Sequence, residues 1–339
     1  MLLKSIKYTR FYYIIKIIIL KFFRLFDPNF VINKGKGGTN SSRYCYSVFM
    51  RHLVCLYNNG ILTVPDKIAE FGPGDSLGTG ICAILSGANE YYAFDIIKRV
   101  NNSRILDIFD ELVIYFKNKY SIPDNIEFPR IGPMLDDYSF PDYILDDLSM
   151  EKNLSEERIE TIRNLLVNLI SDNENSEMNG IIIKYIVPWE KYKNKYPIVD
   201  FIFSQAVLEH IDNLDLFYSV MNKILLDNCF TSHYIDFTSH DEAYEWNGHW
   251  AINQKYWNRA IGKRSYSLNR EPLSTHIKLL EKYGFQIKAS IPWNGLSRTP
   301  SIKRNKLDSN FKHLTDEDFK TSSCFIIANN FSNSNLDKL

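Results

Sequence analysis

The order of elements along the chain predicts an α/β domain built on a mostly parallel sheet. Short apolar runs typical of strands, such as 66–71, 91–95 and 181–187, alternate with stretches that have helical apolar spacing. A glycine-rich segment directly follows the first run, as expected where a strand turns into a helix. A parallel sheet with crossover helices is the simplest account of this order.

The remaining segments continue this alternation. Residues 121–147, rich in proline and aromatic residues, are interpreted as a lid or an insertion, and a helical insertion is expected over about 105–180. We expect one domain over 43–330 and a disordered tail over 331–339. Apolar spacing predicts helices over 43–57, 81–86, 105–120, 154–170, 207–226 and 275–283, and further strands over 199–204, 231–237, 285–289 and 323–328.

Composition narrows the class of protein. The 339 residues carry 40 Lys+Arg against 40 Asp+Glu and are 45% hydrophobic, which excludes wholesale disorder. Zero net charge also argues against a protein dedicated to nucleic acid, which binds phosphates through excess positive charge. The five cysteines show no CxxC spacing, so reduced thiols in a cytoplasmic protein are expected.

The N-terminal segment has a different character. Residues 1–26 combine aromatic and aliphatic side chains with Lys and Arg, and the first acid is Asp27. Lys16 and Lys21 interrupt the apolar run, so a membrane span is not expected. We expect a basic apolar helix over 1–32 that lies at the inner face of the membrane or packs on protein. A flexible linker is expected over 33–42.

The most informative chemistry follows the first two strands. Glu70 precedes Gly72 and Gly74, and Asp95 closes the next strand. A glycine-rich turn lets the backbone approach a ligand closely. A pyrophosphate would be repelled by Glu70, whereas an ammonium group would be attracted to it, and Asp95 can accept hydrogen bonds from ribose hydroxyls. A nucleoside that carries an amino acid therefore fits better than NAD.

In these motifs the chain resembles class I S-adenosylmethionine (SAM)-dependent methyltransferases. Segment 70–74 corresponds to the family's first motif, Asp95 to its ribose-binding acid, and 200–211 to its fourth-strand signature. The resemblance covers about 43–330, and implies SAM as cofactor and a Rossmann-like sheet of seven strands with the last strand antiparallel. Ser76 departs from it, because a third glycine is common there. The SAM contacts that it implies are Glu70, Gly72, Gly74, Asp75, Ser76, Gly78, Asp95, Ser204, Gln205 and, from the preceding helix, Tyr46.

A narrower resemblance concerns the acceptor. Segments 43–47, 72–78, 246–250 and 268–272 are similar to those of bacterial methyltransferases associated with surface-glycan assembly. This resemblance implies methyl transfer to a hydroxyl of a sugar or glycan intermediate. The alternatives are a protein or small-molecule acceptor, or a SAM-binding protein without turnover. No nucleic-acid partner is expected, and the sequence does not indicate an oligomeric state.

Candidates for the acceptor side are concentrated after the fifth strand. A hydroxyl acceptor needs a base to take its proton, and we expect a histidine within 233–249 to supply it. The spacing of His233, Asp236 and His240 could orient such a base or ligate a metal, and we assign no metal ligand. The catalytic candidates are His240, His249, His233 and Asp236.

Several other side chains are also considered for the site. Trp246, Trp250, Trp257 and Asn247 form either a sugar-binding face or ordinary core. Arg270 either clamps a phosphate or carboxylate or forms a surface salt bridge. Trp189 could stack on adenine, and His210 is interpreted as structural. Tyr44 and Arg51 are expected to cover the SAM together with Tyr46.

Overall fold

The structure is a computed structural model. It describes residues 11, 12, 15, 19, 22, 23, 38–100, 102–171, 176–192, 195–240, 242–261, 267–294 and 300–330. The basic side chains of the predicted 1–32 helix, residues 33–37 of the predicted linker and the predicted tail therefore lie outside the described residues. None of the helices in these ranges is long and apolar enough to cross a bilayer.

The described strands form one sheet of eight in the order β3-β4-β2-β1-β5-β6-β8-β7. Its parallel part consists of β4 (Ile181–Ile186), β2 (Glu90–Phe94), β1 (Lys67–Phe71), β5 (Val199–Gln205) and β6 (Leu225–Asp236). The last strand, β8 (Thr321–Asn330), is antiparallel to both β6 and β7 (Phe285–Asn294). The predicted α/β fold with a final antiparallel strand is thus confirmed. The two-residue edge strand β3 (Glu177–Met178), antiparallel to β4, is an eighth strand that was not predicted.

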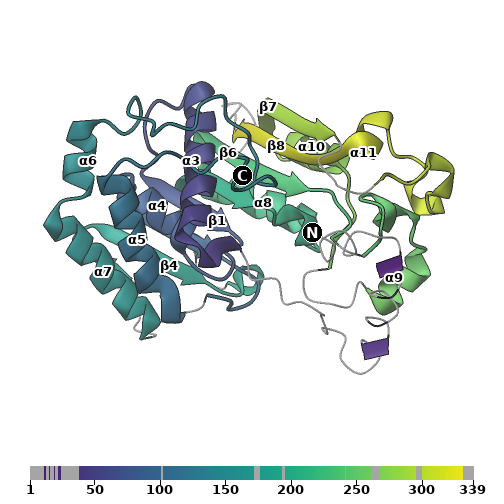
Figure 1. The fold of residues 1–339 in the computed structure, drawn as a ribbon, viewed down its shortest axis with the longest axis horizontal. Helices are drawn as coiled ribbons and strands as arrows, with labels where there is room; N and C mark the ends of the chain where they lie inside the picture. Colours follow the sequence, from purple (N-terminus) through teal and green to yellow (C-terminus); the bar gives the residue numbers. More distant parts are fainter. Residues whose placement is uncertain are drawn as a thin grey trace.

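Helices cover both faces of the sheet. One face packs against α3 (Ser42–Asn58), α4 (Gly78–Leu85), α5 (Ile105–Lys117) and α7 (Glu156–Ile170), and the other against α8 (Leu214–Ile224) and α10 (Leu273–Lys282). The short helices are α6 (Asp147–Asn153), α9 (Gln254–Ala260) and α11 (Asp316–Lys320). Figure 1 shows α5, α6 and α7 at one end of the molecule and α9 and α11 at the other.

The predicted helix over 207–226 is divided. Ala206 has φ +54°, so the chain turns sharply after β5 and forms only a 3-10 turn, η4 (Leu208–His210). Helix α8 begins later, where the Asn213 side chain accepts a hydrogen bond from the backbone of Leu216. The early start predicted from apolar spacing is therefore wrong, and this irregular corner places η4 beside the site.

Arg51 has a structural role instead of the predicted contact with SAM. It is fully buried in α3 and donates to the carbonyl oxygens of Pro123 at 2.9 Å, Ile131 at 2.7 Å and Pro133 at 3.0 Å. Buried carbonyl groups need such donors. Arg51 thus fastens the predicted lid, 121–147, against α3.

Candidate functional site

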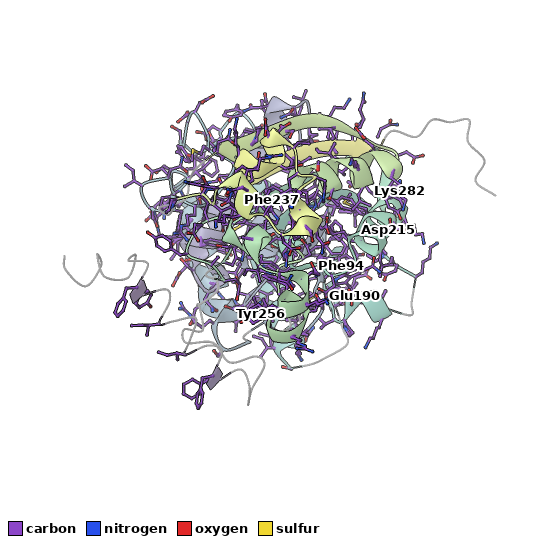
Figure 2. The ribbon with its side chains drawn as sticks, turned by 90° about the vertical axis from the view of Figure 1, so that its right-hand side faces the viewer. Phe94, Glu190, Asp215, Phe237, Tyr256 and Lys282 are labelled. Carbon is purple, nitrogen blue, oxygen red and sulfur yellow. The ribbon has the colours of Figure 1, made fainter. Side chains whose placement is uncertain are left out.

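A cavity of about 230 Å³ lies at the carboxyl ends of β1, β2 and β5. Strand β1 is flanked by β2 on one side and β5 on the other, so the chain leaves the sheet centre in both directions at this point. Ligands of open α/β sheets bind at such switch points. The lining comes from the segments that follow these strands, from η1 (Gly38–Asn40), from Tyr44 and from Trp189. Phe94, one of the lining residues, is labelled in Figure 2.

The glycine-rich turn after β1 has a backbone that a ligand in the cavity can approach closely. Gly72 and Gly74 line the cavity with φ of +71° and +77°, the left-handed region that favours glycine. A Cβ on Gly72 would lie 2.4 Å from Cγ2 of Val207, and one on Gly74 would lie 2.6 Å from Oγ1 of Thr39. Both glycines are therefore required by backbone conformation and by space, as predicted for a ligand-binding turn.

Segment 38–40 covers this turn, although it was predicted as part of a flexible linker. The Thr39 Oγ1 accepts a hydrogen bond from the backbone N–H of Asp75 at 2.8 Å, and the Ser76 hydroxyl donates to the Thr39 carbonyl. Asn40 Nδ2 donates to Asp75 Oδ2 at 3.1 Å. The boundary of the predicted linker is therefore wrong for residues 38–42, which form η1 and the start of α3.

Asp95 has the position predicted for it. It follows β2, lines the cavity and is largely buried. Its Oδ1 accepts from the backbone N–H of Ile96 at 2.7 Å, which fixes the carboxyl orientation. Burial raises its pKa, while the N–H groups of Ile96 and Ile97 act in the opposite direction.

The position of the Glu70 side chain differs from the predicted one. Its side chain is buried and accepts a hydrogen bond from the hydroxyl of Tyr91. Glu70 does not line the cavity. Burial raises its pKa to about 8, so the carboxyl is mostly protonated at neutral pH. The predicted pairing of an ionised Glu70 with an ammonium group therefore has no support in this geometry.

Of the remaining predicted SAM contacts, only Gln205 lines the cavity. Gln205 Oε1 lies 3.1 Å from His52 Nε2, which holds the amide in place. Tyr46 is buried and donates to the carbonyl of Tyr120 at 2.7 Å, so of the two tyrosines expected to cover the SAM only Tyr44 lines the cavity. The cavity lining does not include the others, which are Asp75, Ser76, Gly78 and Ser204.

The apolar wall of the cavity includes Trp189, as predicted. Its ring is buried and meets Phe71 edge to face, with ring centroids 5.4 Å apart. Phe71, Phe94 and Ile96 complete this part of the lining. A flat apolar group such as a purine would be enclosed on this side, since aromatic rings pack well against its edges and faces.

A polar cluster adjoins the opposite part of the lining through His210. Glu209, His210 and His240 place one ligand-type atom each within 4.8 Å of one another. His240 Nε2 lies 3.2 Å from Asp236 Oδ2. Burial opposes ionisation of Asp236, but the charge and hydrogen bond of His240, with hydrogen bonds from Thr238, outweigh it and lower the pKa to about 2. Sequence reasoning missed Glu209 and treated His210 as structural.

None of the four predicted catalytic residues lines the cavity itself, and His233 and His249 also lie outside the cluster of Glu209, His210 and His240. His233 is buried with Nδ1 2.7 Å from Ser204 Oγ and Nε2 2.5 Å from Thr231 Oγ1, and burial lowers its pKa to about 3. This environment is that of a core histidine, so its assignment as a base is wrong. His249 is also buried, and burial followed by the charge of Arg270 lowers its pKa far below the usual value.

The tryptophans expected as a sugar-binding face are buried. Trp246 and Trp250 form a small core with Ile302, Leu307, Phe311 and Leu314, and Trp257 packs in a second one. Asn247 fastens this core by accepting from the backbone of Ile302 at 2.8 Å. The core interpretation of these residues is therefore confirmed.

Arg270 belongs to the same region. Its guanidinium is buried between two aromatic rings, 4.6 Å from the Trp257 centroid and 4.2 Å from the Phe311 centroid. Burial lowers its pKa to about 10. The surface salt bridge considered as one interpretation is thus wrong.

No protein-family model matches the chain, and no curated protein matches either. Among solved structures, the chain is similar to a SAM-dependent methyltransferase from Mesorhizobium loti, with 10% identity, TM-score 0.39, and coverage of 86% of this chain and 100% of that one. A SAM-dependent methyltransferase from Clostridium acetobutylicum gives 8% identity, TM-score 0.37, and coverage of 85% and 92%. Likeness at this level carries no argument about activity, which must come from the site itself.

Proposed function

We propose that the chain is a SAM-dependent methyltransferase. The observation that carries this proposal is that Gly72, Gly74 and Asp95, identified from sequence spacing alone, line one cavity at the switch point of the sheet. The reversed strand β8 between β6 and β7 agrees with the sheet that the sequence resemblance implies.

The residues present suit SAM at this place. Asp95 would accept hydrogen bonds from the ribose hydroxyls, and Trp189 with its apolar neighbours would enclose the adenine. The backbone of Gly72 to Gly74 would follow the methionine part, and Thr39 and Tyr44 would cover it. Bound SAM supplies a methyl group on a positively charged sulfur. The protein then has to exclude water and align the acceptor with that methyl group.

For the acceptor we propose a hydroxyl group. The support is the polar cluster of Glu209, His210, Asp236 and His240 beside the cavity, because a hydroxyl must lose its proton as it is methylated. That the hydroxyl belongs to a sugar or glycan intermediate rests on the sequence resemblance alone, since the tryptophans expected to bind a sugar are core residues. A protein or small-molecule acceptor is the main alternative.

The test is transfer of radiolabelled methyl groups from SAM into fractionated cell extract. We expect label in one acceptor fraction, lost with Asp95→Ala and kept with Asp215→Ala, whose carboxylate is exposed and paired with Lys282 (Figure 2). Label in the glycan fraction would support the sugar acceptor, and label in another fraction would replace it. If no fraction accepts label although the protein binds SAM, a SAM-binding protein without turnover would be favoured.

We further propose that residues 43–330 form the methyltransferase domain in the cytoplasm and that residues 1–26 bring it to the inner membrane surface. The support is the row of basic residues with no acid before Asp27. Full-length protein should sediment with vesicles that contain anionic lipid, and a variant lacking residues 1–30 should not. Equal sedimentation of the two proteins would favour packing of this segment on protein.

A further inference from the structure

The polar cluster beside the cavity combines three side chains of the kinds that bind metal ions. Glu209 and His210 lie in η4, after β5, and His240 lies in the loop after β6. One carboxylate oxygen and one imidazole nitrogen from each histidine lie within 4.8 Å of one another. Two atoms that each lie about 2.0–2.2 Å from one ion are at most about 4.4 Å apart, so small side-chain rotations would let these three atoms contact a single ion.

Within this cluster, Glu209 has a buried carboxyl group that a bound cation would stabilise. Its side chain is 3% exposed, and neither carboxylate oxygen has a hydrogen-bond partner among the residues that the structure describes. Native proteins rarely leave a buried carboxyl group without a partner, because its desolvation is then uncompensated. A positively charged ligand would remove this cost.

The surrounding backbone holds Glu209 in place. Asn269 donates its backbone N–H to the Glu209 carbonyl at 2.8 Å, and its side chain donates to the carbonyls of Leu208 at 2.7 Å and Ile211 at 3.0 Å. The turn is thus fastened on both sides of the carboxylate. A binding group held this firmly loses little conformational freedom when a ligand arrives.

Asp236 supports His240 from the other side. Its Oδ2 lies 3.2 Å from His240 Nε2. A carboxylate beside the imidazole of a metal-binding histidine fixes the orientation of the ring and makes the other nitrogen a better ligand. The contact between Asp236 and His240 has this arrangement.

We propose that Glu209, His210 and His240 bind a divalent transition-metal cation of the zinc type at the edge of the cavity. The set of one carboxylate and two imidazoles determines this class, because Mg²⁺ and Ca²⁺ prefer sites made of oxygen ligands. Three protein ligands also leave a position for a further oxygen, as in sites where a metal ion contacts a substrate. The proposal replaces the expectation from sequence that the site holds no metal.

A role for the ion follows from the place of His210, which lines the cavity. This role rests on the proposed function. The ion would hold the acceptor oxygen in line with the methyl group and lower the pKa of the hydroxyl. His240 would then hold the ion, and the hydroxyl proton would pass to solvent water while the new oxygen–methyl bond forms and the sulfur–methyl bond of SAM breaks.

The test measures binding of Zn²⁺ alone to the full-length protein, untagged, treated with EDTA and free of SAM. Wild-type protein should bind about one equivalent at this site, and Glu209→Gln and His240→Ala should each weaken binding about 10-fold or more. The control is His313→Ala, which removes an exposed histidine outside the cluster and should bind like wild type. Zn²⁺ should also raise the unfolding temperature of wild type and of the control only.

Equal Zn²⁺ affinity in wild type, Glu209→Gln and His240→Ala would overturn the site, as would failure of the wild type to bind. Titration of the same samples with S-adenosylhomocysteine separates this result from the proposed function. Zn²⁺ binding that is lost in the variants, in a protein that does not bind the nucleoside, supports the metal site and contradicts the methyltransferase. A protein that binds the nucleoside but does not bind Zn²⁺ would support the methyltransferase and contradict the metal site.

Discussion

Gly74 and Gly180 have nearly the same left-handed backbone, with φ of +77° and +76°, but different surroundings. Nothing lies within 4 Å of a Cβ built on Gly180, whereas a Cβ on Gly74 would lie 2.6 Å from Thr39 Oγ1. Alanine at 180 should therefore cost only the backbone strain, about 1–2 kcal/mol. Alanine at 74 should cost more, since η1 must also shift, and should weaken nucleoside binding.

Urea unfolding measures the two stability losses, and titration with S-adenosylhomocysteine measures binding. Affinity should fall for Gly74→Ala and stay at the wild-type value for Gly180→Ala. Equal losses of stability, with equal affinity, would show that the contact with Thr39 has no part in shaping the site.

Glu70 should make stability depend on pH. Its pKa is raised to about 8 in the folded protein, mainly by burial, from an ordinary value near 4.5. Between these values the folded chain holds a proton that the unfolded chain releases, so this group destabilises the fold as pH rises, by up to about 1.4 kcal/mol per pH unit. Glu70→Gln keeps an acceptor for Tyr91 and removes the titration.

The measurement is urea unfolding of wild type and Glu70→Gln at pH 5.5 and pH 7.5. The free energy of unfolding of wild type, relative to the variant, should fall by roughly 2–3 kcal/mol between these pH values. All other titrating groups are common to both proteins and cancel in the difference. Parallel pH profiles would contradict the buried, protonated state of Glu70.

At the scale of elements, η1 acts as a cover on the glycine-rich turn. Thr39 accepts from the Asp75 backbone N–H and from the Ser76 hydroxyl, and it lies directly over Gly74. Thr39→Val keeps the shape of the side chain and removes the acceptor for Asp75. We expect the fold to persist and S-adenosylhomocysteine to dissociate several times faster, as measured by stopped-flow.

Thr63→Val is the matched control, because Thr63 is exposed in the loop before β1. Its dissociation rate should equal that of wild type. A Thr39→Val protein that releases the nucleoside at the wild-type rate would show that η1 does not cover the bound ligand.

The elements differ in how well the sequence predicted them. Strands β1, β2 and β4 were placed within about one residue, since buried parallel strands are short continuous apolar runs. Helix α8 was started too early, because the apolar residues of η4 continue its pattern although Ala206 turns the chain. The small cores around Trp250 and Trp257 depend on contacts between distant segments, which local patterns do not record.

At the scale of the whole molecule, the site is formed by segments that are far apart in sequence. Gly72, Gly74, Asp95 and Gln205 were predicted because each follows a strand at a recognisable spacing. Glu70 and Ser204 do not line the cavity, because Glu70 accepts a hydrogen bond from Tyr91 and Ser204 lies against His233 in the core. Glu209 was missed because its neighbour His240 comes from another strand, and only the sheet order brings them together.

The central claim is that this cavity binds the nucleoside of SAM through Asp95. The most direct test is calorimetric titration of full-length protein with S-adenosylhomocysteine, comparing wild type, Asp95→Ala and Asp215→Ala. Loss of hydrogen bonds to a buried carboxylate should weaken binding about 10- to 100-fold for Asp95→Ala. Asp215→Ala should match wild type. Binding that is absent in wild type, or unchanged in Asp95→Ala, would contradict the account.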